Sequence, residues 1–202
     1  MQVTNLNFSD EEKAALSEQN FFLLKNSATK KVVELMGGIE SRIKEDLKKY
    51  TFNVEDLNVK IGKIFRGENY LLFPYVVLDY PKLFSTKSIF AFRTMFWWGH
   101  EFSFTLHLQG DALDIFKGAL DKNLEMLSGK EVYLCVNDTP WQYNFEKDNY
   151  LPVENILAGK EEFLSKSFVK ISRKIDVKLI NEMPDYCLET FNLFASVILT
   201  DI

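Results

Sequence analysis

The stretch SIFAFRTMFWWGHEFSFTLHLQ, residues 88–109, decides the fold that this sequence predicts. Its two halves, residues 88–96 and 101–109, are predicted strands. The second half alternates apolar and polar side chains almost perfectly, and a period of two is typical of a β-strand with one covered face. The link between them, Trp97-Trp98-Gly99-His100, contains a glycine and is typical of a chain reversal. The stretch therefore predicts a β-hairpin with one oily face and one polar face.

The alternation also predicts the register of this hairpin. The oily face of the second half carries Phe102, Phe104, Leu106 and Leu108, and its polar face carries Glu101, Ser103, Thr105 and His107. Matching the phenylalanines of the first half to this oily face requires paired residue numbers to sum to about 198, which a three- or five-residue connection achieves. Arg93 then lies opposite Thr105, whereas a two-residue loop would place Phe92 among polar groups and cost apolar burial.

Helices are predicted on both sides of the hairpin in the sequence. In the N-terminal region, residues 1–50, Ser9 and Glu12 have the spacing of a capping box, and helical spacing resumes over residues 27–50. Gly37-Gly38 is expected to kink or break that second helix. Further helices are predicted over residues 111–127, 160–175 and 184–199, the last two forming the C-terminal region 160–199.

The predicted sheet is a four-strand meander over residues 58–109. Its first strand runs through Ile64-Phe65, a tight reversal is expected at Arg66-Gly67-Glu68-Asn69, and Pro74 marks an edge or bulge in the second strand, residues 70–79. Residues 131–152 are expected to add a strand and a loop. A further strand is an alternative for residues 141–145. This order predicts a single α+β domain, residues 1–202, with helices packed mainly on one face of a mostly antiparallel sheet.

Composition and charge restrict the classes of partner. The chain of 202 residues has 24 Lys and Arg against 29 Asp and Glu, a net charge of -5, and 18 of its residues are Phe. Such a charge repels a phosphate backbone unless a basic patch overrides it, and no patch is visible. We therefore expect no nucleic-acid partner and a core filled by large rings.

The two cysteines and the N-terminus bear on location. Cys135 and Cys187 are isolated among apolar neighbours, as buried free thiols are, which favours a reducing compartment. The first ten residues have neither the basic nor the apolar region of a leader, and no stretch reaches the ~18 apolar residues of a membrane span. We expect a soluble, cytoplasmic protein without membrane insertion.

The polar face of the hairpin is the main candidate site, with two interpretations. It comprises Arg93, Glu101, Ser103, Thr105 and His107. In the first interpretation it is a solvated sheet face on which Arg93 pairs weakly with Glu101. In the second, helices cover part of it and leave a pocket, where Arg93 binds an anionic group and His107 is a general acid or base held by Glu101.

The tryptophan pair at the reversal is a second candidate. Trp97 and Trp98 are expected either as aromatic plugs at the end of the sheet or as exposed anchors of a protein or ring-binding surface. Trp141 is a candidate member of the same cluster.

Other chemistries find little support in the sequence. His100 and His107 differ by an odd number and so face opposite sides of a strand, which argues against a shared metal ion. Cys187 has no histidine nearby in the sequence to activate it, and no phosphate-cradling glycine loop is present. We therefore expect neither a metal nor a cofactor.

Three functional hypotheses follow from these candidates. The leading one is a non-catalytic module that binds a small molecule or a protein, including a homomeric contact through the tryptophan reversal. The second is a cofactor-free enzyme with His107 as its acid or base and Arg93 as its anion-binding residue. The third is a structural subunit of an assembly. The partners they imply are a small anionic molecule, a protein or further copies of the chain.

Overall fold

The computed structural model describes residues 6–52, 54–55 and 57–199. Seven strands form one antiparallel sheet in the order β1-β2-β3-β4-β7-β5-β6. The strands are β1 (Lys63–Tyr70), β2 (Phe73–Phe84), β3 (Ser88–Trp97), β4 (Glu101–Gly110), β5 (Tyr133–Cys135), β6 (Tyr150–Pro152) and β7 (Phe168–Asp176). The helices are α1 (Asp10–Ser17), α2 (Gln19–Asp46), α3 (Asp111–Asn123), α4 (Lys160–Leu164) and α5 (Met183–Ile198).

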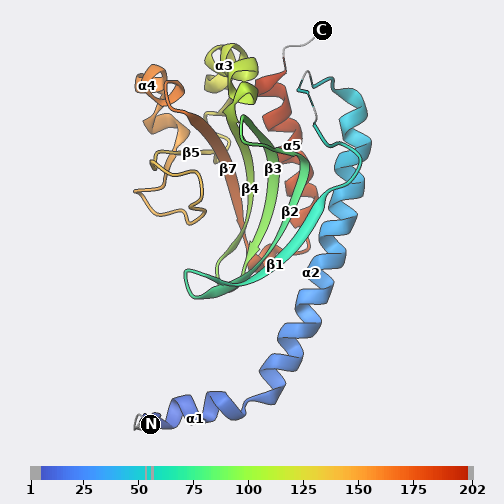
Figure 1. Ribbon diagram of the computed structural model, residues 1–202, viewed down its shortest axis with the longest axis vertical. Coiled ribbons are helices and arrows are strands. Elements are labelled where there is room, and N and C mark those ends of the chain that lie inside the picture. Colours follow the sequence, from blue (N-terminus) through green and yellow to red (C-terminus); the bar gives the residue numbers. More distant parts are fainter. Residues whose placement is uncertain (1–5, 53, 56, 200–202) are drawn as a thin grey trace.

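Three of the helices cover one face of the sheet. The long α2 and α5 lie side by side along it and α3 closes its upper end (Figure 1). The oily residues of the central strands point into this layer, where the rings of Phe92 and Phe191 meet edge to face at 5.2 Å. The predicted architecture, a mostly antiparallel sheet with helices mainly on one face, is confirmed.

The central hairpin has the predicted register. β3 and β4 pair Phe90 with Leu108 and Arg93 with Thr105, and a three-residue connection joins them. Gly99 takes the positive φ of 74° that this connection requires. The oily residues of β4 therefore face the helices and its polar residues face the other side.

That other face is covered by a loop instead of by helices. Residues 136–149, between β5 and β6, cross it and are called the cap loop below. Tyr143 of the cap loop is buried against Val77, Met95 and Trp97. The hairpin residues beneath it, Ser103, Thr105 and His107, are each at most 4% exposed. The interpretation of this face as solvated is therefore wrong. Residues 141–145, for which the sequence allows a further strand, are part of this loop.

Two sequence predictions in the meander need correction. The reversal expected at residues 66–69 is absent, because β1 continues to Tyr70 and turns at Leu71-Leu72. Gly67 lies within the strand, where a Cβ atom would approach the ring of Tyr75 to 2.3 Å, so this glycine makes room for a ring. The strand expected from residue 58 begins at Lys63, and Asn58 makes only an isolated bridge to Lys82.

The helix predictions also need correction in two places. The segment 160–175, expected as a helix, is helical only in α4 and becomes strand β7 from Phe168. Its alternation of Val169, Ile171 and Ile175 with polar residues fits a strand beside β4, and pairing there outweighs local helix propensity. α2 is continuous through Gly37-Gly38, since the residues that flank the glycines, Met36 and Ile39, are buried and hold the helix on the sheet.

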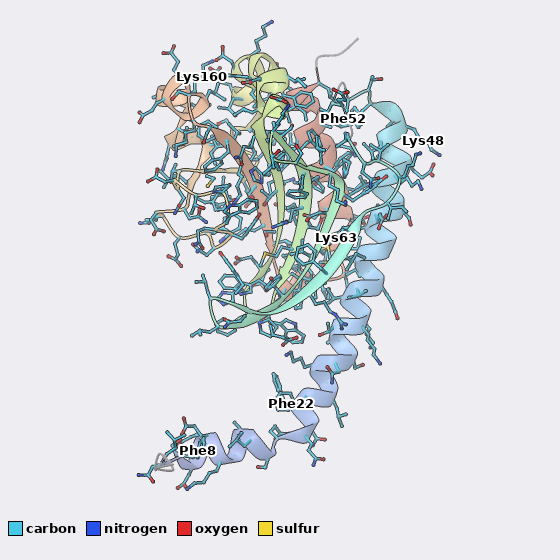
Figure 2. The ribbon with its side chains drawn as sticks, in the orientation of Figure 1. Phe8, Phe22, Lys48, Phe52, Lys63 and Lys160 are labelled. Atoms are coloured by element: carbon cyan, nitrogen blue, oxygen red, sulfur yellow. The ribbon has the colours of Figure 1, made fainter. Side chains whose placement is uncertain are left out.

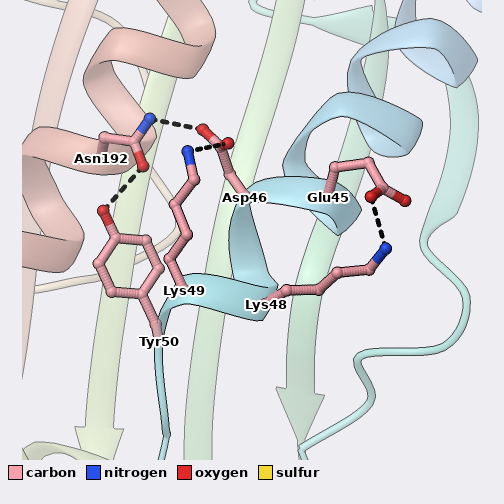
Figure 3. A network of polar contacts seen from close by, with 6 residues as sticks. All are labelled: Glu45, Asp46, Lys48, Lys49, Tyr50 and Asn192. Carbon is pink, nitrogen blue, oxygen red and sulfur yellow. Dashed lines mark hydrogen bonds and ion pairs between the residues drawn. The ribbon is translucent and has the colours of Figure 1, made fainter.

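The C-terminal end of α2 is fixed to the body by a polar network (Figure 3). Asn192 of α5 donates to Asp46 at 2.7 Å and accepts from the hydroxyl of Tyr50 at 2.8 Å. Lys48 and Lys49 each pair with an acidic residue three positions earlier. This end of α2 is thus anchored in the fold, in contrast to its N-terminal end.

Candidate functional site

Arg93 of the predicted polar face is bound within the fold. Its guanidinium forms a bidentate ion pair with Asp79 of β2, in which Nε and Nη2 donate to the two carboxylate oxygens at 2.7 and 2.8 Å. The remaining nitrogen, Nη1, donates to the hydroxyl of Tyr143 at 2.6 Å. Asp79 is directly opposite Arg93 in the register of β2 and β3. The position expected for an anionic ligand is therefore filled by a carboxylate of the chain itself, and the third contact ties the cap loop to the sheet.

A row of hydroxyls continues this network across the sheet. Thr105 hydrogen-bonds Ser172 of β7, and Ser172 donates to the hydroxyl of Tyr150 at 3.2 Å. Burial raises the pKa of Tyr150 well above its usual value, so the phenol stays protonated. Ser103, two residues before Thr105 and on the same face of β4, is also buried. The contacts join strands β4, β7 and β6 under the cap loop.

His107 lies in the same buried layer and is neutral at physiological pH. It is 2% exposed, and its Nε2 has no hydrogen-bond partner among the described residues. Burial, followed by the charges of Lys170 and Arg93, lowers its pKa to about 3. The ring of Trp141 meets it edge-on at 5.8 Å from the outside. An imidazole so enclosed is poorly placed to exchange protons with a substrate in solvent.

Lys170 is a member of this layer that the sequence did not reveal. It is paired with His107 across β4 and β7 and is 0% exposed. Its ammonium donates to the carbonyl of Gln142 at 2.5 Å and lies 4.0 Å from the ring centroid of Tyr143. Burial lowers its pKa to about 7. The alternation of apolar and polar residues over 168–175 is the signal that places Lys170 on the polar face of a strand. This signal is missed because the same segment is predicted to be a helix.

Glu101 is separated from the rest of the predicted site. It is paired with Asp176, whereas His107, six residues along β4, is paired with Lys170. Six residues of strand span about 20 Å, so the carboxylate of Glu101 is out of reach of the imidazole. It lies in a small charged hollow with His100 and Lys174, where burial raises its pKa. The structure brings Arg93, Ser103, Thr105 and His107 together and leaves Glu101 apart.

The tryptophan pair packs as plugs at the end of the sheet. Trp97 is 6% exposed, stacks on His100 with ring centroids 3.5 Å apart, and donates to the carbonyl of Tyr70 at 3.1 Å. Trp98 is partly buried against Phe96 at 5.2 Å. Trp141 lies on the cap loop against His107 and is half exposed. These rings offer no shared open surface.

An exposed apolar surface lies instead at the N-terminus. Residues 6–24, called the arm below, comprise α1 and the start of α2 and extend away from the sheet (Figure 1). Phe8 and Phe22 mark its length in Figure 2. α1 buries none of its residues, and the first buried residue of α2 is Thr29. More than half of each large apolar side chain on the arm is exposed: Leu6, Phe8, Leu16, Phe21, Phe22, Leu23 and Leu24.

The bend between the two helices of the arm is concave. Phe8, Glu12, Ala15, Leu16 and Phe22 line a hollow of about 400 Å³, called the elbow below. All five residues come from the arm itself. The signal in the sequence was the run Phe21-Phe22-Leu23-Leu24, because four consecutive apolar residues on a helix point to all its sides and cannot all face one core.

A second exposed apolar feature lies at the same end of the molecule. The β1–β2 turn carries Leu71 at 51%, Leu72 at 86% and Phe73 at 42% exposure. Lys25 of α2 forms an ion pair with Glu68 of β1 at 2.7 Å, so the base of the arm lies beside the strand that leads into this turn. Of the eighteen exposed large apolar side chains in the described part of the chain, seven lie on the arm and three at this turn.

Comparison with known proteins gives no assignment. The chain has no significant match to any protein-family model, curated protein or solved structure. Within the described residues, no three or more His, Cys, Asp or Glu side chains are grouped in a way that would hold a metal ion. None of the helices described has both the length and the apolar character needed to cross a bilayer.

Proposed function

We propose that this protein is a non-catalytic interaction module that associates with a second copy of itself through the arm. The observation that carries the proposal is the set of seven large apolar side chains on the arm, each more than half exposed. Monomeric proteins rarely leave so many large apolar side chains exposed to water on one short segment, and such a segment is typical of a docking site. The leading hypothesis from the sequence is thereby retained, with its contact moved from Trp97-Trp98 to the arm.

The charge of the arm favours a protein partner over a lipid surface. Residues 6–24 contain four acidic side chains, at positions 10, 11, 12 and 18, and one basic side chain, Lys13. Helices that lie on membranes carry lysine and arginine on their polar face, because the lipid surface they meet is anionic. An acidic arm is repelled by that surface, while a second copy offers apolar side chains at the same end of the fold.

The buried polar network is a scaffold in this proposal. Its two cationic side chains each hold the cap loop to the sheet, Arg93 through Tyr143 and Lys170 through Gln142. We place the module in the cytoplasm, since Cys135 and Cys187 are buried free thiols of the kind that a reducing compartment preserves.

The proposal is tested by the mass of the protein in solution. The paired substitution Leu23→Gln and Leu24→Gln removes two of the most exposed apolar side chains of the arm, which are 67% and 69% exposed. Glutamine is a good helix former, so α2 should keep its helical conformation. Light scattering should give two copies for the wild type and one for this variant, with unchanged near-ultraviolet circular dichroism, which reports the packing of the aromatic core.

A matched control is Ile115→Gln on α3, an apolar residue 48% exposed and far from the arm. It should leave the mass at two copies. A wild type that remains a single copy at high micromolar concentration, or an arm variant that associates as tightly as the wild type, contradicts the proposal.

A further inference from the structure

The β1–β2 turn has a backbone conformation that its residues disfavour. Leu71 and Leu72 form a two-residue connection between the paired residues Tyr70 and Phe73, and both have positive φ, 47° and 74°. Two-residue turns of this kind favour Asn-Gly, because a Cβ atom is unfavourable in left-handed backbone. Two leucines therefore occupy one of the least suitable positions in the chain for them.

These leucines are poorly buried in their own fold. Leu72 is 86% exposed, the highest value among the large apolar side chains of the described chain, and Leu71 is 51% exposed. A strained backbone that displays apolar side chains to water indicates that the side chains serve a contact elsewhere. The turn is convex and apolar, whereas the elbow is concave and apolar.

We propose that the Leu71-Leu72 turn of one copy inserts into the elbow of a second copy, and that the two contacts are reciprocal about a two-fold axis. This inference rests on the proposed self-association and names its contact surfaces. The elbow, at about 400 Å³, has ample room, since a cavity of about 150 Å³ in a protein core already accepts a benzene ring.

The position of the two surfaces suits a two-fold arrangement. The Lys25 to Glu68 ion pair holds the base of the arm beside the strand that enters the turn, and Figure 1 shows the arm and this turn at the same end of the molecule. One axis at that end brings each turn to the opposite elbow at once, which is the self-complementary contact of a closed dimer.

The decisive variant replaces the turn by the sequence that the backbone prefers, Leu71→Asn with Leu72→Gly. At a protein concentration low enough for both proteins to be monomeric, its thermal midpoint should be equal to or above that of the wild type, because the turn is relieved. Its dissociation constant for the dimer should rise at least tenfold, because the inserted side chains are gone. A structural role for the leucines would give the opposite pattern, a lower midpoint with the dimer intact.

A crosslinking experiment locates the contact. Leu16→Cys in the elbow and Leu72→Cys in the turn are made in separate chains that carry tags of different size, and both are treated with a short bismaleimide. The mixture should give a crosslinked heterodimer in excess of the products of either chain alone, and wild-type chains, whose two thiols are buried, should give none.

The outcomes separate this inference from the proposed function. If the Asn-Gly variant dimerises as tightly as the wild type, or the mixture gives no excess of heterodimer, the inference is overturned. The proposed function then still stands, provided that Leu23→Gln with Leu24→Gln dissociates the dimer. A wild type that is monomeric, or a dimer insensitive to the arm variant, overturns both.

Discussion

Lys170 lies fully buried between the sheet and the cap loop, and burial lowers its pKa to about 7. In the unfolded chain the same ammonium titrates near 10.5. Below pH 7 both states hold the proton, and between pH 7 and 10.5 the unfolded state binds more protons. The free energy of unfolding therefore rises with pH across this window, by up to about 1.4 kcal/mol per pH unit from this group.

Lys170→Met should remove this contribution. Urea denaturation at pH 7.0 and 8.5 should show a smaller rise in the free energy of unfolding for the variant than for the wild type, and the difference of the two slopes isolates Lys170. Lys117→Met on the exposed side of α3 is the control and should keep the wild-type slope. Equal slopes for Lys170→Met and the wild type would show that the ammonium is solvated.

For single residues, the sequence predicts which side chains of the hairpin share the polar face, but it does not predict the partners that bury them. The alternation along β4 places Ser103, Thr105 and His107 on one face beside Arg93, as found. It carries no information on the partners that reach them from elsewhere, Asp79 from β2 and Tyr143 from the cap loop. Whether a polar face is wet or covered depends on a segment distant in sequence, which local alternation does not encode.

Among the elements, α1 depends most on an outside partner. It has eight residues and a complete capping box at Ser9, yet it buries nothing. Isolated helices shorter than ~12 residues are marginal in water, so the cap alone does not hold it. In the proposed dimer α1 is covered by the second copy. Its stability should therefore change with association.

Hydrogen exchange tests this dependence. Amides of residues 12–17 should exchange slowly in the wild-type dimer and at least tenfold faster in the monomeric Leu23→Gln and Leu24→Gln variant. Amides of α5, buried against the sheet in either state, serve as the internal reference and should be unchanged. Equal protection of α1 in both proteins would mean that the helix is stable without a partner.

The sequence predicts an element correctly where one pattern dominates, and incorrectly where two patterns compete. The hairpin of β3 and β4 and the helix α5 follow from clear periodicity. Residues 168–175 include Lys170, Arg173 and Lys174, which suit a helix as well as the surface of a sheet, and pairing with β4 decides the outcome. Gly37-Gly38 weakens α2 locally, but the burial of the neighbouring turns keeps the helix continuous.

At the scale of the whole molecule, self-association can either stop at a closed dimer or continue by adding further copies. A turn that enters the elbow of the next copy without reciprocity would leave one free elbow and one free turn at the ends of a growing chain. With a two-fold axis, both elbows and both turns are used within two copies, and neither of these two surfaces is left free to bind a third copy.

The two arrangements differ in how mass depends on concentration. We expect the wild type to reach two copies and to hold that mass over a hundredfold range of concentration above its dissociation constant, as measured by light scattering. A chain with Leu16→Gln in the elbow and a chain with the Asn-Gly turn should each be monomeric alone. Mixed, they should form a weaker heterodimer, because the intact turn of the first fits the intact elbow of the second. A mass that keeps growing with concentration would instead indicate an open, head-to-tail assembly through the same two surfaces.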